Sequence, residues 1–400
     1  MHAAPPTLDY AIYDADEHYY EPDDCFTRHI EAKFRERTAR VERTEPGKPG
    51  RMYVGSTRCH FFSVGAGDSV GPPGIMKEFL RGTTAQGGNP GLNPIDALAV
   101  PEFTQRAARL RKMDEQDVEA CLILPTMGVG LEAQLREDPD VLYPSLRAFN
   151  RWLEEDWGYG SDGRVFGAPL GSLFDVDKGV RELDRLLAAG ARFVILTAGP
   201  PAVGRSPAEP AYDPFWARCE EAGVNVVFHI GRTPFSEMYN VPWGLRPHPP
   251  SHRHSLMEYH LSFTERPVAD TLTALVADNL FGRFPGLKVL SVEYGSSWVT
   301  PLVKKLDAIA RLYSKDMWRF GRPDLAPGDL FRRNVWVVPF YEDDVVGLTK
   351  TLGVEHVLGG SDYPHPEGLL WPSEFAEELG GLDADAVRRI MRENLAALVA

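Results

Sequence analysis

The chain has 400 residues with 43 basic and 57 acidic side chains, which gives a net charge of −14. This acidic balance argues against nucleic acid or an anionic membrane surface as a partner, and no run of about 18 apolar residues predicts a membrane span. An apolar fraction of 43% is enough for the core of one large α/β barrel or of two smaller domains.

The cysteines and the N-terminal segment indicate the compartment. The four cysteines are far apart in sequence and none belongs to a C-x-x-C pair, so we expect free thiols in a reducing environment: Cys25, Cys59, Cys121 and Cys219. The N-terminal segment lacks the charged region and apolar stretch of a secretory signal. We therefore expect a cytoplasmic protein that acts on a small molecule.

The first predicted strand is the most informative stretch. The apolar run 10–13 leads into Asp14, Asp16 and His18, and Glu21 follows shortly after. Residues two apart in a strand point to the same side, so we expect the first three side chains to share one face. A carboxylate and an imidazole at this spacing can reach one divalent cation. The alternative is a strand end whose acids cap the next helix.

A long insertion, at about 30–100, is expected to follow this strand. Short alternating pieces in 37–62 predict a β-hairpin. The segment 63–101 is rich in Gly, Pro and Asn, and we expect either an ordered excursion over a site or a flexible surface insertion. A second insertion, rich in aromatic residues, His and Pro, is expected at 231–265.

From Pro101 onward, apolar strands alternate with amphipathic helices. Further strands are predicted at 118–124, 165–170, 193–196, 224–228, 287–292, 335–338 and 356–359. Helices are predicted at 103–116, 144–157, 175–189, 214–222, 268–281, 298–318, 343–352 and 384–397. In the first of these helices, Arg109 is expected on the outer face.

Eight such units predict one (β/α)₈ TIM barrel of the metal-dependent hydrolase type that spans 1–400 as a single domain. The alternative is a doubly wound open sheet. That fold normally carries a glycine-rich phosphate-binding turn after an early strand. Here the first strand ends in acids and a histidine, so the closed barrel is favoured.

Polar side chains stand where four of the predicted strands end. The strand ends of a barrel meet at one mouth, and they carry Asp16, His18, His229, Glu293 and Asp362. Two imidazoles with carboxylates suit Zn²⁺ best, with Mn²⁺ or Fe²⁺ as further possibilities. The fourth strand ends at Thr197, without a lysine that could bridge two metals, so we expect one ion.

Each of these residues also has a structural interpretation. His229 could be a hydrogen-bonded core histidine, Glu293 could support a ligand rather than be one, and Asp362 could cap a turn. We expect His365 to play a supporting part. The remaining candidates lie in the second insertion and are expected at its surface: His248, His252, His254 and His260.

Three further residues are candidates for substrate contact. Arg232 follows His229 by three positions and could grip a carboxylate through a bidentate pair, or form a surface salt bridge. Trp243 and Trp298 could wall an apolar pocket, or could pack in the core.

Taken together, the motifs resemble amidohydrolase-related family 2, which includes aminocarboxymuconate-semialdehyde decarboxylase and resorcylate-type decarboxylases. The resemblance rests on Asp14-x-Asp16-x-His18 with Glu21-Pro22, on His229, on 284–288 leading to Glu293, on 361–365 and on 393–398. It implies a barrel, a mononuclear metal held by Asp16, His18, His229 and Asp362, and a homodimer. Relatives often have His or Glu at the position of Asp16, and the named decarboxylase has a functional His at the position of Glu293.

Three functions fit these residues. The first is non-oxidative decarboxylation of a small aromatic or unsaturated carboxylate, with Asp362, Glu293 and His229 as the catalytic residues and Asp362 as the proton carrier. The second is hydrolysis of an ester, lactone or amide by a metal-activated water at the same site. The third, from a different class, is a barrel that binds a ligand without turning it over.

Overall fold

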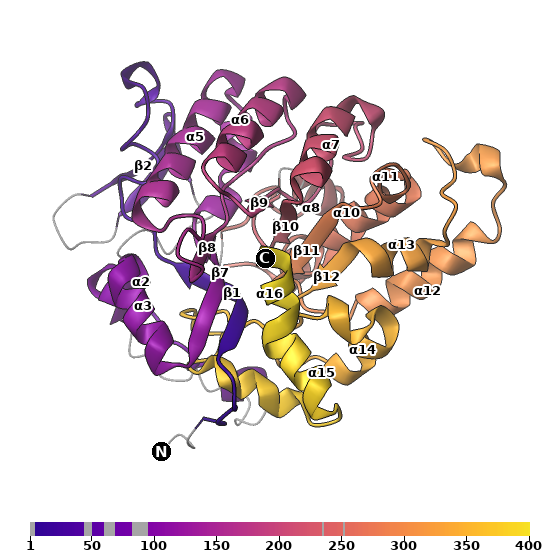
Figure 1. The fold of residues 1–400 in the computed structure, drawn as a ribbon. Helices are drawn as coiled ribbons and strands as arrows, with labels where there is room; N and C mark the ends of the chain where they lie inside the picture. Colours follow the sequence, from indigo (N-terminus) through magenta and orange to yellow (C-terminus); the bar gives the residue numbers. More distant parts are fainter. Residues whose placement is uncertain (1–4, 44–49, 60–68, 82–94, 234–235, 251–252) are drawn as a thin grey trace.

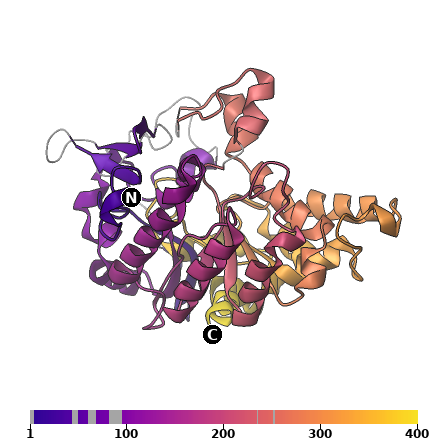
Figure 2. The same cartoon turned by 90° about the horizontal axis from the view of Figure 1, so that it is seen from above.

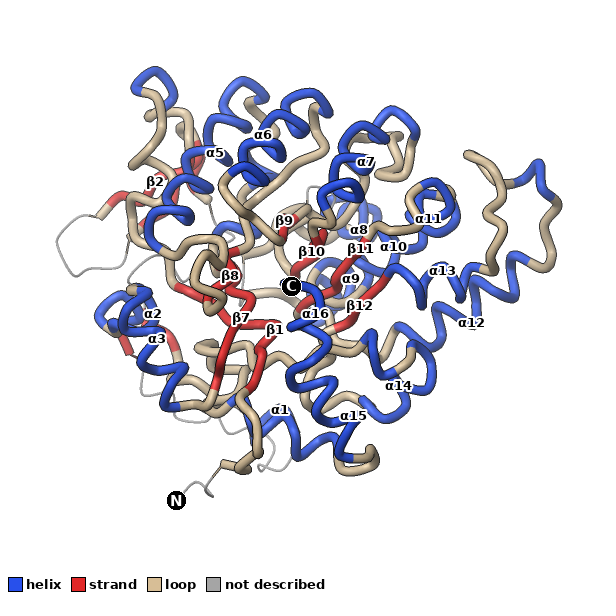
Figure 3. Tube along the Cα trace, viewed as in Figure 1, coloured by secondary structure: helices blue, strands red, loops and turns tan. Residues whose placement is uncertain are grey.

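The architecture is that of a closed barrel of parallel strands surrounded by helices (Figure 1). It comes from a computed structural model that describes residues 5–43, 50–59, 69–81, 95–233, 236–250 and 253–400. The central strands are β1 (Ile12–Tyr19), β7 (Val118–Pro125), β8 (Val165–Gly167), β9 (Phe193–Ile195), β10 (Asn225–His229), β11 (Lys288–Val292) and β12 (Val335–Val337). Figure 3 shows them at the centre with the helices around them.

The barrel closes through short bridges between its strands. The strand orders are β1-β7-β8 and β12-β11-β10-β9, and all of these pairs are parallel. Leu170 bridges to Ile195, and Val357 bridges to Val337. The segment 357–359 is therefore the eighth strand, or stave, of the barrel. The amide of Ala15 donates to the carbonyl of Gly359 at 2.9 Å, which joins this stave to β1. The predicted TIM barrel is therefore confirmed, and the open sheet is excluded.

The helices follow the predicted alternation. They are α1 (Lys77–Leu80), α2 (Pro101–Thr104), α3 (Arg106–Glu115), α4 (Glu132–Leu135), α5 (Pro139–Asp156), α6 (Val176–Ala188), α7 (Asp213–Ala222), α8 (Ser236–Asn240), α9 (Leu256–Ser262), α10 (Arg266–Ala277), α11 (Leu280–Arg283), α12 (Val299–Ala310), α13 (Pro327–Asn334), α14 (Val345–Leu352), α15 (Ala384–Arg388) and α16 (Asn394–Val399). None of the helices in the described ranges is long and apolar enough to cross a membrane.

Three predicted helices differ from the structure: 103–116 is divided between α2 and α3, 268–281 is divided between α10 and α11, and 298–318 ends early. The pattern predicted a helix over 298–318, but α12 ends at Ala310. The hydroxyl of Ser314 donates to the carboxylate of Asp316 in the turn that follows. Such local side-chain bonds offer the backbone an alternative to a helical ladder, which is why Ser and Asp favour turns.

The two insertions rise from one end of the barrel, opposite the end where the C-terminus lies (Figure 2). The predicted hairpin is present as an antiparallel sheet of β2 (Ala39–Glu42), β3 (Arg51–Val54) and β4 (Thr57–Arg58), although its expected turn at 44–49 lies outside the described residues. In the segment 63–101, β5 (Ser69–Val70) pairs with β6 (Ile95–Asp96), and 63–68 and 82–94 lie outside the description. The second insertion carries α8, α9 and the short helix Val241–Trp243.

The prediction that Arg109 lies on the outer face of its helix is wrong. Arg109 is fully buried between α3 and β1, where its Nη1 donates to Glu17 Oε2 at 2.8 Å and its Nη2 to the carbonyl of His18 at 2.6 Å. Because Asp16 and His18 point into the barrel mouth, Glu17 points toward the helices, and a carboxylate buried there requires a cation. This pair therefore holds the end of β1 in place.

We predict that Arg109→Met lowers the free energy of unfolding by about 3–5 kcal/mol, because it leaves Glu17 as an uncompensated buried charge. The double variant Glu17→Leu/Arg109→Met should lose less than the single variant. Urea denaturation measures both. As a control, Arg37→Met removes a half-exposed pair with Asp138 and should cost at most about 1 kcal/mol. Equal losses in all three variants would contradict this account.

Candidate metal centre

The structure brings together the polar side chains predicted at four strand ends. Asp16 and His18 lie in β1, His229 is the last residue of β10, Glu293 directly follows β11, and Asp362 follows the stave 357–359. His18 and His229 are buried, with relative exposures of 0% and 5%. Segments that are more than 200 residues apart in the sequence thus meet at one mouth, as His18 and His229 do.

Four of these side chains converge on one point. His18 Nε2 and His229 Nε2 lie 3.3 Å apart. Glu293 Oε2 lies 2.9 Å from His229 Nε2 and 3.5 Å from His18 Nε2, and Asp16 Oδ1 lies 3.2 Å from His18 Nε2. One ligand atom from each of the four lies within 4.8 Å of every other.

This geometry fits a divalent transition metal. Metal–ligand bonds of about 2.0–2.2 Å place neighbouring ligand atoms about 3 Å apart at tetrahedral or octahedral angles. Two imidazole nitrogens that face each other across 3.3 Å need a cation or a proton between them. Asp16 Oδ1 is buried and accepts no hydrogen bond from any described residue. The donor set of two imidazoles and two carboxylates suits zinc, manganese or iron.

Asp362 stands beside this group and is bound to a histidine. Its Oδ1 lies 3.5 Å from His18 Nε2 and 2.6 Å from His365 Nδ1. His365 Nε2 lies 3.1 Å from the hydroxyl of Thr126, and the His365 ring is 4.1 Å from the His18 ring. His18, Glu293, Asp362 and His365 form a second, overlapping group of possible ligands. The i, i+3 spacing of Asp362 and His365 is the sequence signal that could have shown this contact.

The backbone directs both acids inward. Glu293 has a φ of 59° and Asp362 a φ of 56°, in the left-handed region that residues with a side chain rarely adopt. Such conformations cost energy and persist where the surrounding structure holds them, often at functional sites.

Asp14 does not join the group, although the alternation of β1 predicted a shared face. Its Oδ1 accepts the amides of Asp16 and of Ser361, each at 3.0 Å. The register of β1 against β7 shifts between Asp14 and Glu17, which breaks the simple alternation. Asp14 instead fastens β1 to the segment that carries Asp362.

The buried charges shift one another's protonation. Burial alone would lower the pKa of His18, but the neighbouring carboxylates of Asp16 and Glu293 outweigh it and raise the pKa to about 10. Burial alone would raise the pKa of Glu293, but His229 and His18 hold it below its usual range. Burial, together with Glu293 and Asp16, raises the pKa of Asp362 well above its usual value.

Sequence reasoning missed two residues near the mouth. Burial and the charge of Glu293 raise the pKa of Glu367 to about 7. Burial, Glu367 and Glu293 raise the pKa of Tyr259, a residue of α9. Tyr259 belongs to the second insertion, whereas Glu367 follows Asp362 by five residues.

The end of β9 is occupied by protein contacts. The hydroxyl of Thr197 donates to Glu132, whose carboxylate also accepts from Ser172 Oγ at 2.5 Å and pairs with Arg136 at 2.7 Å. The Glu132 carboxylate is therefore already paired with its neighbours and is not left to bind a second metal ion. The centre is one for a single divalent metal.

The candidates for substrate contact lie in different environments. Arg232 is buried, with 6% exposure. Trp298 is also buried and donates its indole N–H to the carbonyl of Gly295 at 3.0 Å. Trp243 is 67% exposed on the second insertion. Of the loop histidines, His248 contacts Ser236, His254 packs on Phe263, His260 is exposed and His252 lies outside the described residues.

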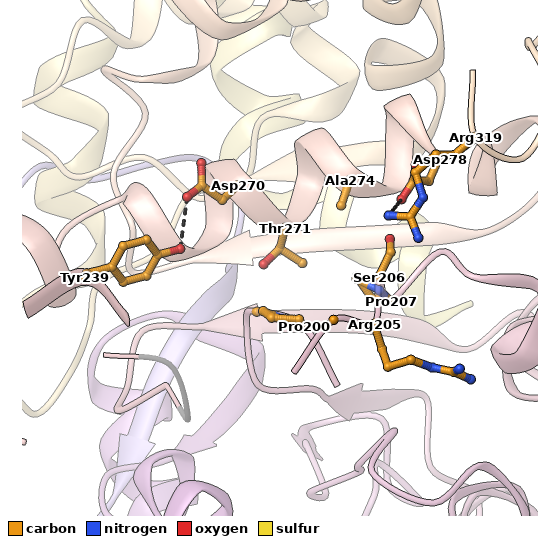
Figure 4. Close-up of a pocket in the computed structure, with 12 residues that line it drawn as sticks. Pro200, Arg205, Ser206, Pro207, Tyr239, Asp270, Thr271, Ala274, Asp278 and Arg319 are labelled. Carbon is orange, nitrogen blue, oxygen red and sulfur yellow. Dashed lines mark hydrogen bonds and ion pairs between the residues drawn. The ribbon is translucent and has the colours of Figure 1, made fainter. Parts of the chain in front are cut away.

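A cleft of about 360 Å³ lies between the loop after β9 and α10, away from the cluster residues (Figure 4). Its polar side chains pair with one another or with close neighbours. Tyr239 donates to Asp270 at 2.9 Å, and Arg319 lies 3.6 Å from Asp278 (Figure 4). Arg205 lies 2.7 Å from Glu209.

Comparison with known proteins identifies the family. The amidohydrolase family profile matches residues 57–399. The chain belongs to the amidohydrolase family. The resemblance seen in the sequence motifs is therefore confirmed, and a metal-dependent enzyme is the established character of this barrel.

Solved amidohydrolase-fold structures match nearly the whole chain. The crystal structure of an amidohydrolase from Mycobacterium avium subsp. paratuberculosis K-10 shares 36% identity at a TM-score of 0.89, covering 98% of this chain and 100% of that one. A dihydroxybenzoic acid decarboxylase from Polaromonas sp. JS666, with bound manganese and 2-nitroresorcinol, shares 14% identity at 0.60, covering 98% and 97%. A 2,6-dihydroxybenzoate decarboxylase from Rhizobium shares 15% at 0.61, covering 98% of each. The latter two show the fold.

We predict that metal binding releases a proton. With a pKa of about 10, His18 is protonated at pH 7 in the metal-free protein, whereas a metal ligand must be neutral. Affinity for Zn²⁺ or Mn²⁺ should therefore rise about tenfold per pH unit from pH 7 to 9. Calorimetric titration in buffers of different ionisation enthalpy measures the released proton. An affinity that does not change with pH would contradict the prediction.

Proposed function

We propose that this amidohydrolase is a carboxy-lyase that removes CO₂, without oxidation, from a small aromatic or unsaturated carboxylate. The observation that carries the proposal is the placement of Asp362, a carboxyl with a raised pKa, 3.5 Å from a ligand nitrogen of the metal centre. Decarboxylases also occur among the proteins that share the fold. The substrate class proposed here, a small aromatic carboxylate, is taken from the substrates of these decarboxylases.

The four converging residues would hold the metal. Asp16, His18, His229 and Glu293 each direct one donor atom to the same point. When bound, a divalent metal supplies positive charge that draws electrons from the oxygens of the substrate. We propose Zn²⁺ on the basis of the donor set, with manganese, which one neighbour binds, as the first alternative.

Asp362 would carry the proton. When the C–C bond to the carboxylate breaks, its electron pair stays on the ring or chain carbon, and Asp362 donates a proton to that carbon as CO₂ leaves. The reaction needs no oxidant or reductant. The hydrogen bond between His365 Nδ1 and Asp362 Oδ1, at 2.6 Å, fixes which way the Asp362 carboxyl faces. His229 and Glu293 would contribute as residues that lie beside the carboxylate that leaves the substrate as CO₂.

The two tryptophans would contribute apolar surface. Trp298 binds the carbonyl of Gly295, two residues after Glu293, and so fixes the loop that carries this acid. Trp243 lies exposed on the second insertion and would cover the substrate from outside.

Hydrolysis is the second candidate, because the 36% identical relative is described as an amidohydrolase. In that reaction Asp362 would accept the proton of the attacking water and pass it to the leaving group. The non-catalytic barrel is not proposed, because the chain belongs to a family of metal-dependent enzymes and its donor set is complete.

We further propose that the protein forms a homodimer in the cytoplasm. Large apolar side chains are exposed at the end of α12 and just beyond it, where Leu312 is 80% and Met317 is 60% exposed. A second copy would cover them, and light scattering should then give twice the chain mass of 44.5 kDa. The four cysteines are all buried and form no disulfide, which fits a reducing compartment.

A substrate screen separates the two reactions. Protein stripped with a chelator and reloaded with Zn²⁺, Mn²⁺ or Fe²⁺ is incubated with hydroxybenzoates, benzene dicarboxylates, esters, lactones and amides. We expect CO₂ release from one or more aromatic carboxylates in the loaded protein only. Ester or amide cleavage without CO₂ release would instead support hydrolysis.

Asp362→Asn should lower kcat by about 10²–10⁴-fold, because the amide cannot donate the proton. Metal content, measured by elemental analysis, should stay close to that of the wild type. Asp383→Asn, which changes only the N-terminal cap of α15, is the matched control and should retain activity. Full activity in Asp362→Asn would show that another group carries the proton.

A further inference from the structure

Arg232 is a buried cation that has no hydrogen-bond or ion-pair partner among the described residues. Its exposure is 6%, and its Nε is enclosed and makes no hydrogen bond to any described residue. Among the ion pairs of the described chain, none includes Arg232. A charge in the protein interior is costly unless an opposite charge or hydrogen bonds compensate for it. An arginine in this state is available to bind an anion.

Arg109 shows what a structural buried arginine looks like in the same protein. It is fully buried, and its guanidinium binds Glu17, the carbonyl of His18 and the carbonyl of Glu102. The surface arginines, such as Arg28 and Arg37, pair with acids at 3.5 Å or less. Arg232 differs from both kinds, so a role in holding the fold does not explain it.

The position of Arg232 places it at the mouth of the barrel. It lies three residues after His229, where β10 ends and the second insertion begins. The preceding residue, Gly231, packs so closely on Val129 that a Cβ would come within 2.8 Å of the Val129 carbonyl oxygen, which pins this segment. The groups that act on Arg232 electrostatically are Cys59, Glu137 and Glu237, and Arg232 itself acts on His248.

A substrate with more than one carboxylate would need a positive charge in addition to the metal ion. The carboxylates of Asp16 and Glu293 would neutralise a divalent ion, and Asp362 carries its proton in the proposed reaction. The centre itself then has no surplus positive charge to balance a second carboxylate of the substrate. The fork of a guanidinium matches a carboxylate in two parallel hydrogen bonds.

We propose that Arg232 binds a carboxylate of the substrate that does not touch the metal, so that the substrate is a dicarboxylate. This inference rests on the proposed function, in which the other carboxylate faces the metal and leaves as CO₂. Arg232 is thus a residue that determines specificity, and it selects substrates with a second acidic group.

The test measures binding rather than turnover. Metal-loaded protein is titrated with benzene-1,3-dicarboxylate and with its monomethyl ester, which lacks one charge. We expect the dicarboxylate to bind at least about tenfold more tightly, a preference that a lost charge-assisted pair would account for. Arg232→Met should abolish this preference, and Arg232→Lys should retain part of it, because an ammonium keeps the charge without the fork.

Thermal unfolding separates this role from a structural one. Without ligand, Arg232→Met should keep or raise Tm, because an uncompensated charge is removed, whereas the matched variant Arg109→Met should lower Tm. An unchanged ligand preference in Arg232→Met, no dicarboxylate binding by the wild type, or tighter binding of inorganic phosphate than of the dicarboxylate would each overturn the proposal.

The two proposals can fail separately. If no carboxylate releases CO₂ but the preference depends on Arg232, decarboxylation is wrong and the anchor remains. If CO₂ is released from monocarboxylates alone and Arg232→Met retains full kcat/KM, the anchor is wrong and decarboxylation remains.

Discussion

Two histidine nitrogens that face each other across 3.3 Å, with carboxylates on either side, are the constraint on which the rest of this structure depends. At such separations the buried imidazoles and acids need a metal ion or a proton among them. The closed barrel provides a rigid frame. Asp16 and His18 lie in β1, and each of the other side chains lies at or just beyond the end of another barrel strand.

The contacts behind the cluster explain how it is held. Arg109 binds Glu17 and the carbonyl of His18 from the outer side of β1. Asp14 accepts amides from both β1 and the segment that carries Asp362, and His365 fixes the Asp362 carboxyl. Buried charges that are satisfied in this way hold the geometry. Arg232, which has no such partner among the residues that the structure describes, stands out for that reason.

The sequence allowed the barrel and the main site residues to be predicted, because alternating apolar strands and helices are a local pattern and strand ends meet by topology. It could not show that Arg109 faces inward, because the partner, Glu17, is 92 residues away. The role of Asp14 depended on a register shift, and the end of α12 on a side-chain bond within a turn. His365 needed the fold of its own loop to reach Asp362.

The most direct test of the account is a crystal structure of the metal-loaded protein with anomalous diffraction measured at the absorption edge of the metal. We expect one anomalous peak per chain, at about 2.0–2.2 Å from His18 Nε2 and His229 Nε2 and from a carboxylate oxygen of Asp16 or Glu293. No peak at the barrel mouth, or a peak bound by other residues, would contradict the account.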